Sequence, residues 1–152
     1  MAEIRTTPLM TIKLAVAGMQ AIGATPSGNR RVGLVAGGTF EGPKLRGTVL
    51  PGGADWLMLR ADGATTLDVR LVLETDDKAT IGMTYRGLRH GPAAVMDRLN
   101  KGENVDPSEY YFRIAVGFET AAPKYDWLNR IFAIGTGRRP PEGPVYEIFE
   151  VL

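Results

Sequence analysis

Apolar and polar residues alternate with a period of two along most of the chain, a pattern typical of β-strands with one buried face. In residues 66–74, four aliphatic side chains alternate with Asp68, Arg70 and Glu74. Residues 11–17 and 110–119 alternate in the same way. Weaker versions of the pattern predict six more strands, at 31–36, 44–50, 56–60, 80–86, 130–136 and 145–151. The chain is therefore expected to be all-β, with eight to nine strands.

Turn-forming residues separate these strands. The segments rich in Gly, Pro, Asn and Asp are "TPSGN", "LPGGA", "ADGA", "TDDK" and "GRRPPEGP". Short strands joined by close-set turns favour an antiparallel barrel or sandwich. Because no Pro-rich or charged linker divides the 152 residues, we expect a single β-barrel domain over 1–152.

One stretch, "HGPAAVMDRLNKGE", departs from the period of two. Val95, Met96 and Leu99 fall on one face of a helical pattern, Pro92 suits its first turn, and Gly102 suits its end. We expect one short amphipathic helix that packs on the mouth or the outer wall of the barrel.

Composition excludes several classes of function. The chain has no cysteine, so disulfides and thiolate chemistry are ruled out, and its single histidine, His90, cannot form a multi-histidine metal site. The glycines of "VAGGTFEGP" lack the Lys-Ser or Lys-Thr of a phosphate loop. We therefore expect neither a metal nor a cofactor. The absence of cysteine makes a reducing cytoplasm the simplest location. The net charge of +1 is mixed along the chain and no apolar run is long enough for a membrane span, so we expect neither nucleic-acid nor membrane partners.

Charged side chains on the strand faces are the remaining candidates for chemistry. Asp68 and Arg70 share one strand face, and Tyr111, Arg113 and Glu119 share another. In one interpretation these faces lie in water, as in most antiparallel sheets. In the other they line the barrel lumen, where the two carboxylates would have to pair with the arginines because an unpaired buried charge is very costly.

Five blocks of sequence resemble, in order, the family called domain of unknown function 3237, also known as uncharacterised protein family 0311. The blocks are "GGTFEGPKLRGTVLPGGADW", "LDVRLVLETDD", "GLRHGP", "DPSEYYFR" and "FETAAPKYDWLNR". The resemblance implies a compact antiparallel β-barrel, similar in shape to the allene oxide cyclase and dirigent barrels, with a central cavity for a small apolar molecule. Because the blocks retain acids, arginines and aromatics at strand positions, the resemblance favours the lumen interpretation.

Asp55 and Trp56 directly follow a run of glycines, which we expect to turn the chain at a barrel rim. Adjacent strand residues point to opposite faces, so one of the two enters the lumen. A carboxylate partly removed from water can exchange a proton near neutral pH, which makes Asp55 the preferred catalytic candidate. The other catalytic candidates are Asp68, Arg70, Tyr111, Arg113 and Glu119, and the substrate-binding candidates are Trp56, Tyr85, His90 and Trp127.

Three functions remain open at this point. The first is a cofactor-independent lyase, isomerase or cyclase in which a carboxylate removes a proton next to a carbonyl and an arginine stabilises the oxyanion. The second is a carrier that binds a small apolar or aromatic molecule unchanged. The third is a structural barrel filled by its own side chains, and a homo-oligomer is compatible with each.

Overall fold

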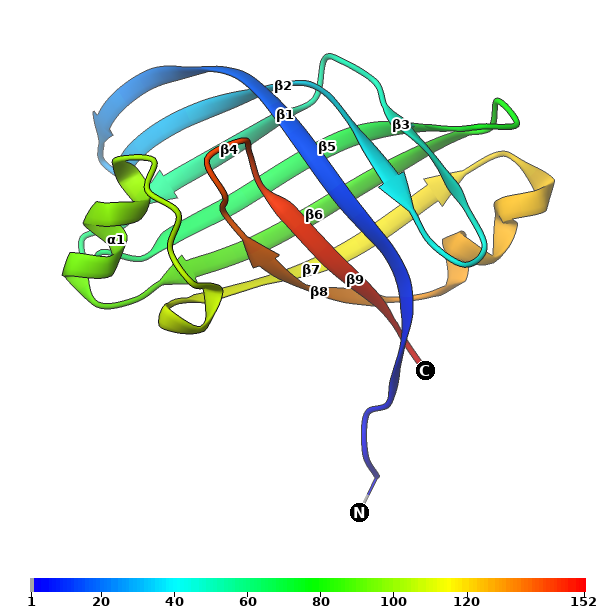
Figure 1. Ribbon diagram of the computed structural model, residues 1–152. Coiled ribbons are helices and arrows are strands. Elements are labelled where there is room, and N and C mark those ends of the chain that lie inside the picture. The colour runs from blue at the N-terminus through cyan, green and yellow to red at the C-terminus, as the bar shows by residue number, and fades with distance from the viewer. Residues whose placement is uncertain (1) are drawn as a thin grey trace.

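The computed structural model describes residues 2–152, and nine antiparallel strands in it form one sheet that closes on itself (Figure 1). Neighbouring strands follow the order β1-β9-β8-β7-β6-β5-β3-β2-β4, and pairing of β1 with β2 and of β4 with β5 closes the ring. The prediction of an antiparallel barrel is therefore confirmed. The strands are β1 (Thr6–Thr25), β2 (Gly28–Glu41), β3 (Arg46–Val49), β4 (Ala54–Leu59), β5 (Thr65–Thr75), β6 (Thr80–His90), β7 (Tyr111–Thr120), β8 (Ala133–Arg138) and β9 (Val145–Val151).

Strands β3 and β4 occupy one position in the ring, end to end between β2 and β5. β3 pairs with one end of each neighbour and β4 with the other, while residues 50–53 leave the ladder between them. The N–H of Val35 donates to the carbonyl of Gly53 at 2.9 Å, which fixes this bulge against β2. A Cβ atom at Gly53 would lie 2.7 Å from the carbonyl oxygen of Arg70, so only glycine allows the close approach. The chain turns at Pro51 and Gly52 as expected, but the expected place at a barrel rim is wrong, because the turn forms a bulge within the wall.

The apolar rows of the strands face inward and the charged rows face outward. In β5, Leu67 and Val69 are buried while Asp68 and Arg70 are exposed. In β7, Phe112 and Ile114 are buried, whereas the alternate row is not: Tyr111, Arg113 and Glu119 are exposed. The lumen interpretation of these two charged rows is therefore wrong. Outside the barrel the charges keep their hydration, and the apolar rows are removed from water inside it.

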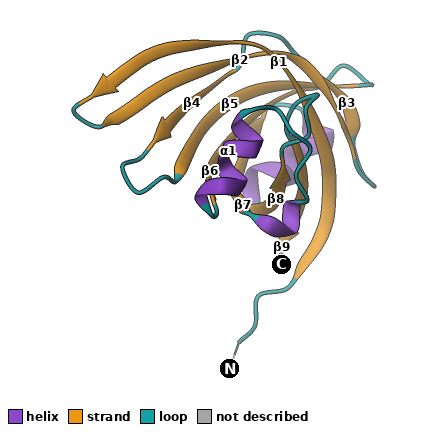
Figure 2. Ribbon diagram, turned by 60° about the vertical axis from the view of Figure 1, so that its left-hand side comes forward, coloured by secondary structure: helices purple, strands orange, loops and turns teal. Residues whose placement is uncertain are grey.

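Helical segments cover the two ends of the barrel (Figures 1 and 2). α1 (Ala93–Asn100) lies at one end and buries Met96 and Leu99 in the core, as expected for a helix at the barrel mouth. Gly102, with φ +80°, follows the helix, and its N–H donates to the carbonyl of Leu99 at 3.0 Å. η2 (Pro123–Arg130) lies at the opposite end, and η1 (Pro107–Glu109) precedes β7. No helix within residues 2–152 is long and apolar enough to cross a membrane.

The hydrophobic core lies inside the ring, where Phe40, Leu73, Ile81, Phe112 and Ile148 are almost completely buried. The barrel wall is incomplete along β1. This strand pairs with β9 only over residues 6–13, although it continues beside β2 as far as Thr25. The far half of β1, after residue 13, therefore has an edge that β9 does not pair with.

Candidate active site

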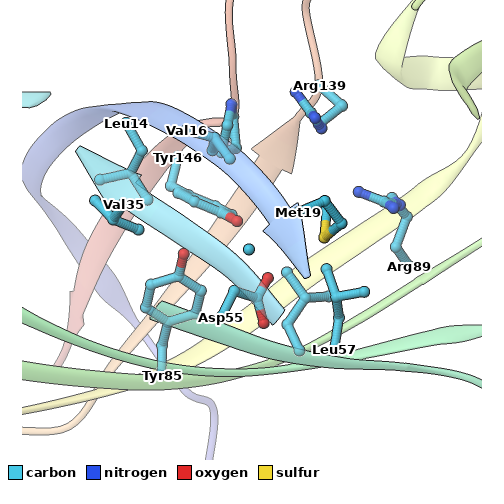
Figure 3. Close-up of a pocket in the computed structure, with 13 residues that line it drawn as sticks. Leu14, Val16, Met19, Val35, Asp55, Leu57, Tyr85, Arg89, Arg139 and Tyr146 are labelled. Atoms are coloured by element: carbon cyan, nitrogen blue, oxygen red, sulfur yellow. The ribbon is translucent and has the colours of Figure 1, made fainter. Parts of the chain in front are cut away.

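A small pocket of about 70 Å³ lies in the barrel beneath the far half of β1 (Figure 3). This volume is below the roughly 300–1,000 Å³ typical of small-molecule sites, so a ring-sized ligand would have to extend through the open mouth of the pocket. Most of the wall is apolar, formed by Leu14, Val16, Met19, Val35, Leu57, Leu67 and Pro144. The polar groups are few: Asp55, Tyr85, Tyr146, Arg89 and Arg139. We call this site the Asp55 pocket.

Asp55 lies in β4, opposite Gly33 of β2 and Val69 of β5, with its side chain turned into the pocket. Burial raises the pKa of its carboxyl from 3.8 to about 7. The backbone N–H of Asp68 donates to Asp55 Oδ1 at 3.2 Å and lowers this pKa in part, as do the positive charges of Arg89 and Arg139. A carboxyl with this pKa can both accept and donate a proton near neutral pH.

Two tyrosines from different strands face each other next to Asp55. The ring centroids of Tyr85 in β6 and Tyr146 in β9 are 5.0 Å apart, with an angle of 60° between the planes. Phe112 supports Tyr146 from the other side, at 5.4 Å and 88°. Burial raises the pKa of both hydroxyls, so they remain protonated near neutral pH. The pocket therefore holds two hydroxyl donors beside one acid–base group.

Two arginines complete the polar lining. Arg89 is the penultimate residue of β6, and its guanidinium carbon lies 5.3 Å from the centroid of the Phe112 ring. Burial lowers the pKa of Arg89, and the positive charge of Arg139 acts in the same direction. Arg139 follows β8, and its backbone N–H donates to the Tyr110 hydroxyl at 3.0 Å, which holds this loop against the barrel.

Of the residues proposed from sequence, the structure brings only Asp55 and Tyr85 into this pocket. Asp68, Arg70, Tyr111, Arg113 and Glu119 are exposed on the outer wall, and Trp56 points outward and is 50% exposed. His90 is also exposed, and it stacks on Tyr111 at 5.0 Å, with the Arg113 guanidinium 5.1 Å from the same ring. Trp127 lies in η2 at the other end of the barrel, with Lys44 over its ring at 4.8 Å.

Sequence reasoning did not select Arg89, Arg139 or Tyr146 for the site. The strand predicted over 80–86 ends too early, whereas β6 continues to His90. With the correct end, Arg89 falls on the same face as Tyr85, four residues away. Tyr146 lies within a predicted strand and is on its buried face. Nothing in the local pattern marks Arg139, because it belongs to a loop.

The metal-ligating side chains do not gather at this site or elsewhere in the described part of the chain. Within residues 2–152, no group of three His, Cys, Asp or Glu side chains is placed to hold a metal ion. The chemistry available to the chain's own residues in the pocket is proton transfer by Asp55, hydrogen bonding by the tyrosines and charge stabilisation by the arginines.

Fold and pocket together define a small antiparallel β-barrel with a carboxyl of raised pKa in an interior pocket. The family model described as "Protein of unknown function (DUF3237)" matches residues 4–151, and the chain belongs to this family. A UPF0311 protein of Rhodopseudomonas palustris is 33% identical over 149 residues, which cover 98% of this chain and 97% of that protein. The family assignment from the five sequence blocks is therefore confirmed.

Solved structures show the same fold. A conserved protein of unknown function from Rhodopseudomonas palustris superposes with a TM-score of 0.96 at 32% identity, covering 100% of both chains. A protein from Acinetobacter baumannii described as β-barrel like gives a TM-score of 0.87 at 38% identity, covering 99% of this chain and 98% of that one.

One relative has a named activity. The hydroalkoxylation enzyme phnH of Penicillium herquei is 31% identical over 102 residues, which cover 67% of this chain and 53% of that protein. A solved enzyme from Penicillium herquei also shares the fold, with a TM-score of 0.72 at 23% identity over 99% of this chain and 94% of that one.

Proposed function

We propose that the protein is a cofactor-independent lyase, isomerase or cyclase that acts on a small cyclic or aromatic compound by acid–base chemistry in the Asp55 pocket. The observation that carries the proposal is the placement of Asp55: a carboxyl whose pKa is raised to about 7, aimed into an apolar pocket beside two hydroxyl donors. Perturbed carboxyls in pockets of this kind are typical of general acids and bases.

Asp55 serves as the proton-transfer group. As a carboxylate it removes a proton from a carbon next to a carbonyl, and the electron pair of the broken C–H bond moves toward the carbonyl oxygen. The protonated Asp55 then returns the proton to a second position, which leaves the substrate isomerised. No electrons enter or leave the site, so the step needs neither an oxidant nor a reductant.

Tyr146 and Tyr85 serve as donors to the developing oxyanion. Both hydroxyls remain protonated, because burial raises the pKa of each. A hydrogen bond that strengthens as negative charge develops lowers the barrier, and removal of one such donor typically reduces turnover by ~10²–10³. The apolar wall excludes water, which strengthens this interaction.

The resemblance to a hydroalkoxylation enzyme supports the same chemistry. In a hydroalkoxylation, an O–H bond adds across a carbon–carbon double bond, so a C–O bond and a C–H bond form while the proton changes partners. When both groups belong to one molecule the product is a cyclic ether. A single acid–base carboxyl in an apolar pocket supplies what this addition requires, and cyclisation is therefore one of the reactions that we propose.

Isotope exchange tests the proposal. A panel of bicyclic ketones and lactones, including 2-tetralone and dihydrocoumarin, is first screened for binding by thermal shift. Exchange of the acidic C–H of each binder in heavy water is then followed by NMR with the wild-type protein, Asp55→Asn and Asp68→Asn. Asp68 is the matched control, since its side chain is exposed on the adjacent strand.

The expected result is catalysed exchange by the wild type, a loss of about a hundredfold or more in Asp55→Asn, and exchange within about threefold of wild type in Asp68→Asn. If the wild type binds a ligand but does not catalyse exchange of its C–H, the proposal of an enzyme is contradicted and a carrier is favoured. Exchange that survives in Asp55→Asn would place the base elsewhere.

A further inference from the structure

We propose that the Asp55 pocket binds an anionic substrate: a small cyclic or aromatic compound whose carboxylate, phenolate or enolate oxygen lies between Arg89 and Arg139. The inference rests on the proposed function, since it assigns the substrate class of the same site. The shared chemistry of these compounds is one delocalised negative charge on oxygen, attached to an apolar body.

Arg89 is held inside the barrel with part of its hydrogen-bonding capacity unused. Its Nε atom is buried and has no hydrogen-bond partner among residues 2–152. The guanidinium packs on the Phe112 ring, which fixes its position but provides no acceptor. A buried donor without a partner is expensive, roughly 1–3 kcal/mol, so its retention in a pocket indicates a partner that arrives with the ligand.

Arg139 adds a second positive charge to the same pocket (Figure 3). The ion pairs formed within residues 2–152 include neither Arg89 nor Arg139. Each arginine interacts electrostatically with Asp55, and the two repel each other. Two guanidinium groups without a carboxylate partner create a positive field that one oxyanion would neutralise, and guanidinium forms its strongest hydrogen bonds to such oxygens.

The rest of the pocket determines what the anion is attached to. Leu14, Val16, Val35 and Leu57 line the wall, so an inorganic anion would leave most of this surface without contacts. An aromatic or alicyclic ring suits the apolar wall, with the charged oxygen at the arginines. Asp55 is then left to act on the body of the ligand, because the charged group is bound by other residues.

Matched pairs of an anion and its neutral analogue test the proposal. The probes are 2-naphthoate with 2-naphthamide and trans-cinnamate with trans-cinnamamide, and dissociation constants are measured by isothermal titration and saturation-transfer NMR. Each carboxylate is expected to bind at least about tenfold more tightly than its amide. Sodium sulfate at the same ionic strength is expected not to displace it.

Variants identify the groups responsible. Arg89→Gln and Arg139→Gln are each expected to reduce the preference for the carboxylate to about twofold or less. The controls are Arg86→Gln, on the outer face of β6, and Arg138→Gln, exposed beside Arg139; both are expected to retain the preference. Two-dimensional NMR spectra verify that each variant is folded.

Equal affinities within both pairs, or no binding of either carboxylate, would overturn the proposal. So would a preference that persists in both Arg89→Gln and Arg139→Gln. The outcome is separable from that of the exchange experiment, which uses neutral ketones and lactones. A carboxylate preference without exchange would refute the catalytic proposal alone, whereas exchange that depends on Asp55 without a carboxylate preference would refute the anion proposal alone.

Discussion

Gly33 of β2 lies opposite Asp55 of β4, and a Cβ atom placed on Gly33 would be 3.8 Å from the Cβ atom of Asp55. This is ordinary contact, and the backbone of Gly33 is not in the left-handed region that requires glycine. The position therefore accepts a side chain without strain. Glycine leaves the narrow space between the Met19 and Asp55 side chains without a side chain of its own.

The first prediction follows from this space. Gly33→Leu should fill the Asp55 pocket and reduce ligand affinity by about tenfold or more, while the protein remains folded. The shift in melting temperature produced by a bound ligand measures the effect. Gly117→Leu is the matched control, because Gly117 lies on the outward row of β7 with only Thr84 near its Cβ position. An undiminished ligand shift in Gly33→Leu would show that ligands bind elsewhere.

The second prediction concerns stability and pH. The folded protein holds the proton of Asp55 more tightly than the unfolded chain, with a pKa of about 7 compared with 3.8. The stability that this provides is therefore complete below about pH 4 and is lost as the pH rises through about 7. The loss is on the order of 4 kcal/mol, and it should be absent in Asp55→Asn.

The quantity to measure is the difference between wild type and Asp55→Asn in the free energy of unfolding, determined with urea from pH 4 to pH 9. The difference removes contributions from other groups, such as Asp77, whose pKa is lowered first by its hydrogen bond with Lys124. A constant difference over this range would mean that Asp55 titrates in the folded protein as it does in the unfolded chain.

The third prediction separates the inner from the outer tyrosines. Tyr146→Phe removes a hydroxyl that faces Asp55 and should reduce catalysed exchange by about a hundredfold, with a much smaller effect on binding. Tyr111→Phe should leave exchange unchanged, because Tyr111 is 44% exposed on the outer wall. Single-turnover exchange rates and ligand titrations provide the comparison. Equal effects of the two substitutions would contradict the placement of the chemistry inside the barrel.

The fourth prediction is that Arg89 lowers the stability of the folded protein and strengthens carboxylate binding. Because the Nε atom of Arg89 is buried without a hydrogen-bond partner and the side chain forms no ion pair within residues 2–152, Arg89→Met should raise the free energy of unfolding by about 1 kcal/mol. The same substitution should weaken carboxylate binding. Arg86→Met on the outer face should change stability by less than about 0.5 kcal/mol. Urea denaturation measures the free energy of unfolding of both variants. A destabilised Arg89→Met would mean that the packing of Arg89 on Phe112 contributes more to stability than its desolvation costs.

The sequence by itself determined the strands of this protein. All nine appear at their predicted places, since a period of two is a local property that directly reflects which side chains must leave water, although β1 (Thr6–Thr25) and β2 (Gly28–Glu41) extend well beyond the predicted 11–17 and 31–36. The helix at α1 was equally predictable, because the proline before it and the glycine after it fix its ends by local backbone geometry. Alternation also showed that Asp55 and Trp56 must point to opposite faces.

Alternation separates an apolar row from a charged row in each strand, but it does not show which row faces the barrel interior. The family resemblance favoured the charged rows for the interior. The sheet closure resolved this, because it placed the apolar rows of β5 and β7 around a shared interior. Asp68, Arg70, Tyr111, Arg113 and Glu119 were therefore assigned to the wrong side. The physical reason is that an unpaired charge has a much lower free energy in water than in a barrel interior. The family resemblance gives no information on this free-energy difference.

Only the tertiary structure could assemble the Asp55 pocket. Its polar groups come from β4, β6, β9 and the loop after β8, which are far apart in the sequence and meet only when the ring closes. The raised pKa of Asp55 is likewise a property of the closed barrel, because burial by residues of other strands causes it. The sequence could mark Asp55 as a candidate, but the low-polarity surroundings that raise the pKa of its carboxyl exist only in the fold.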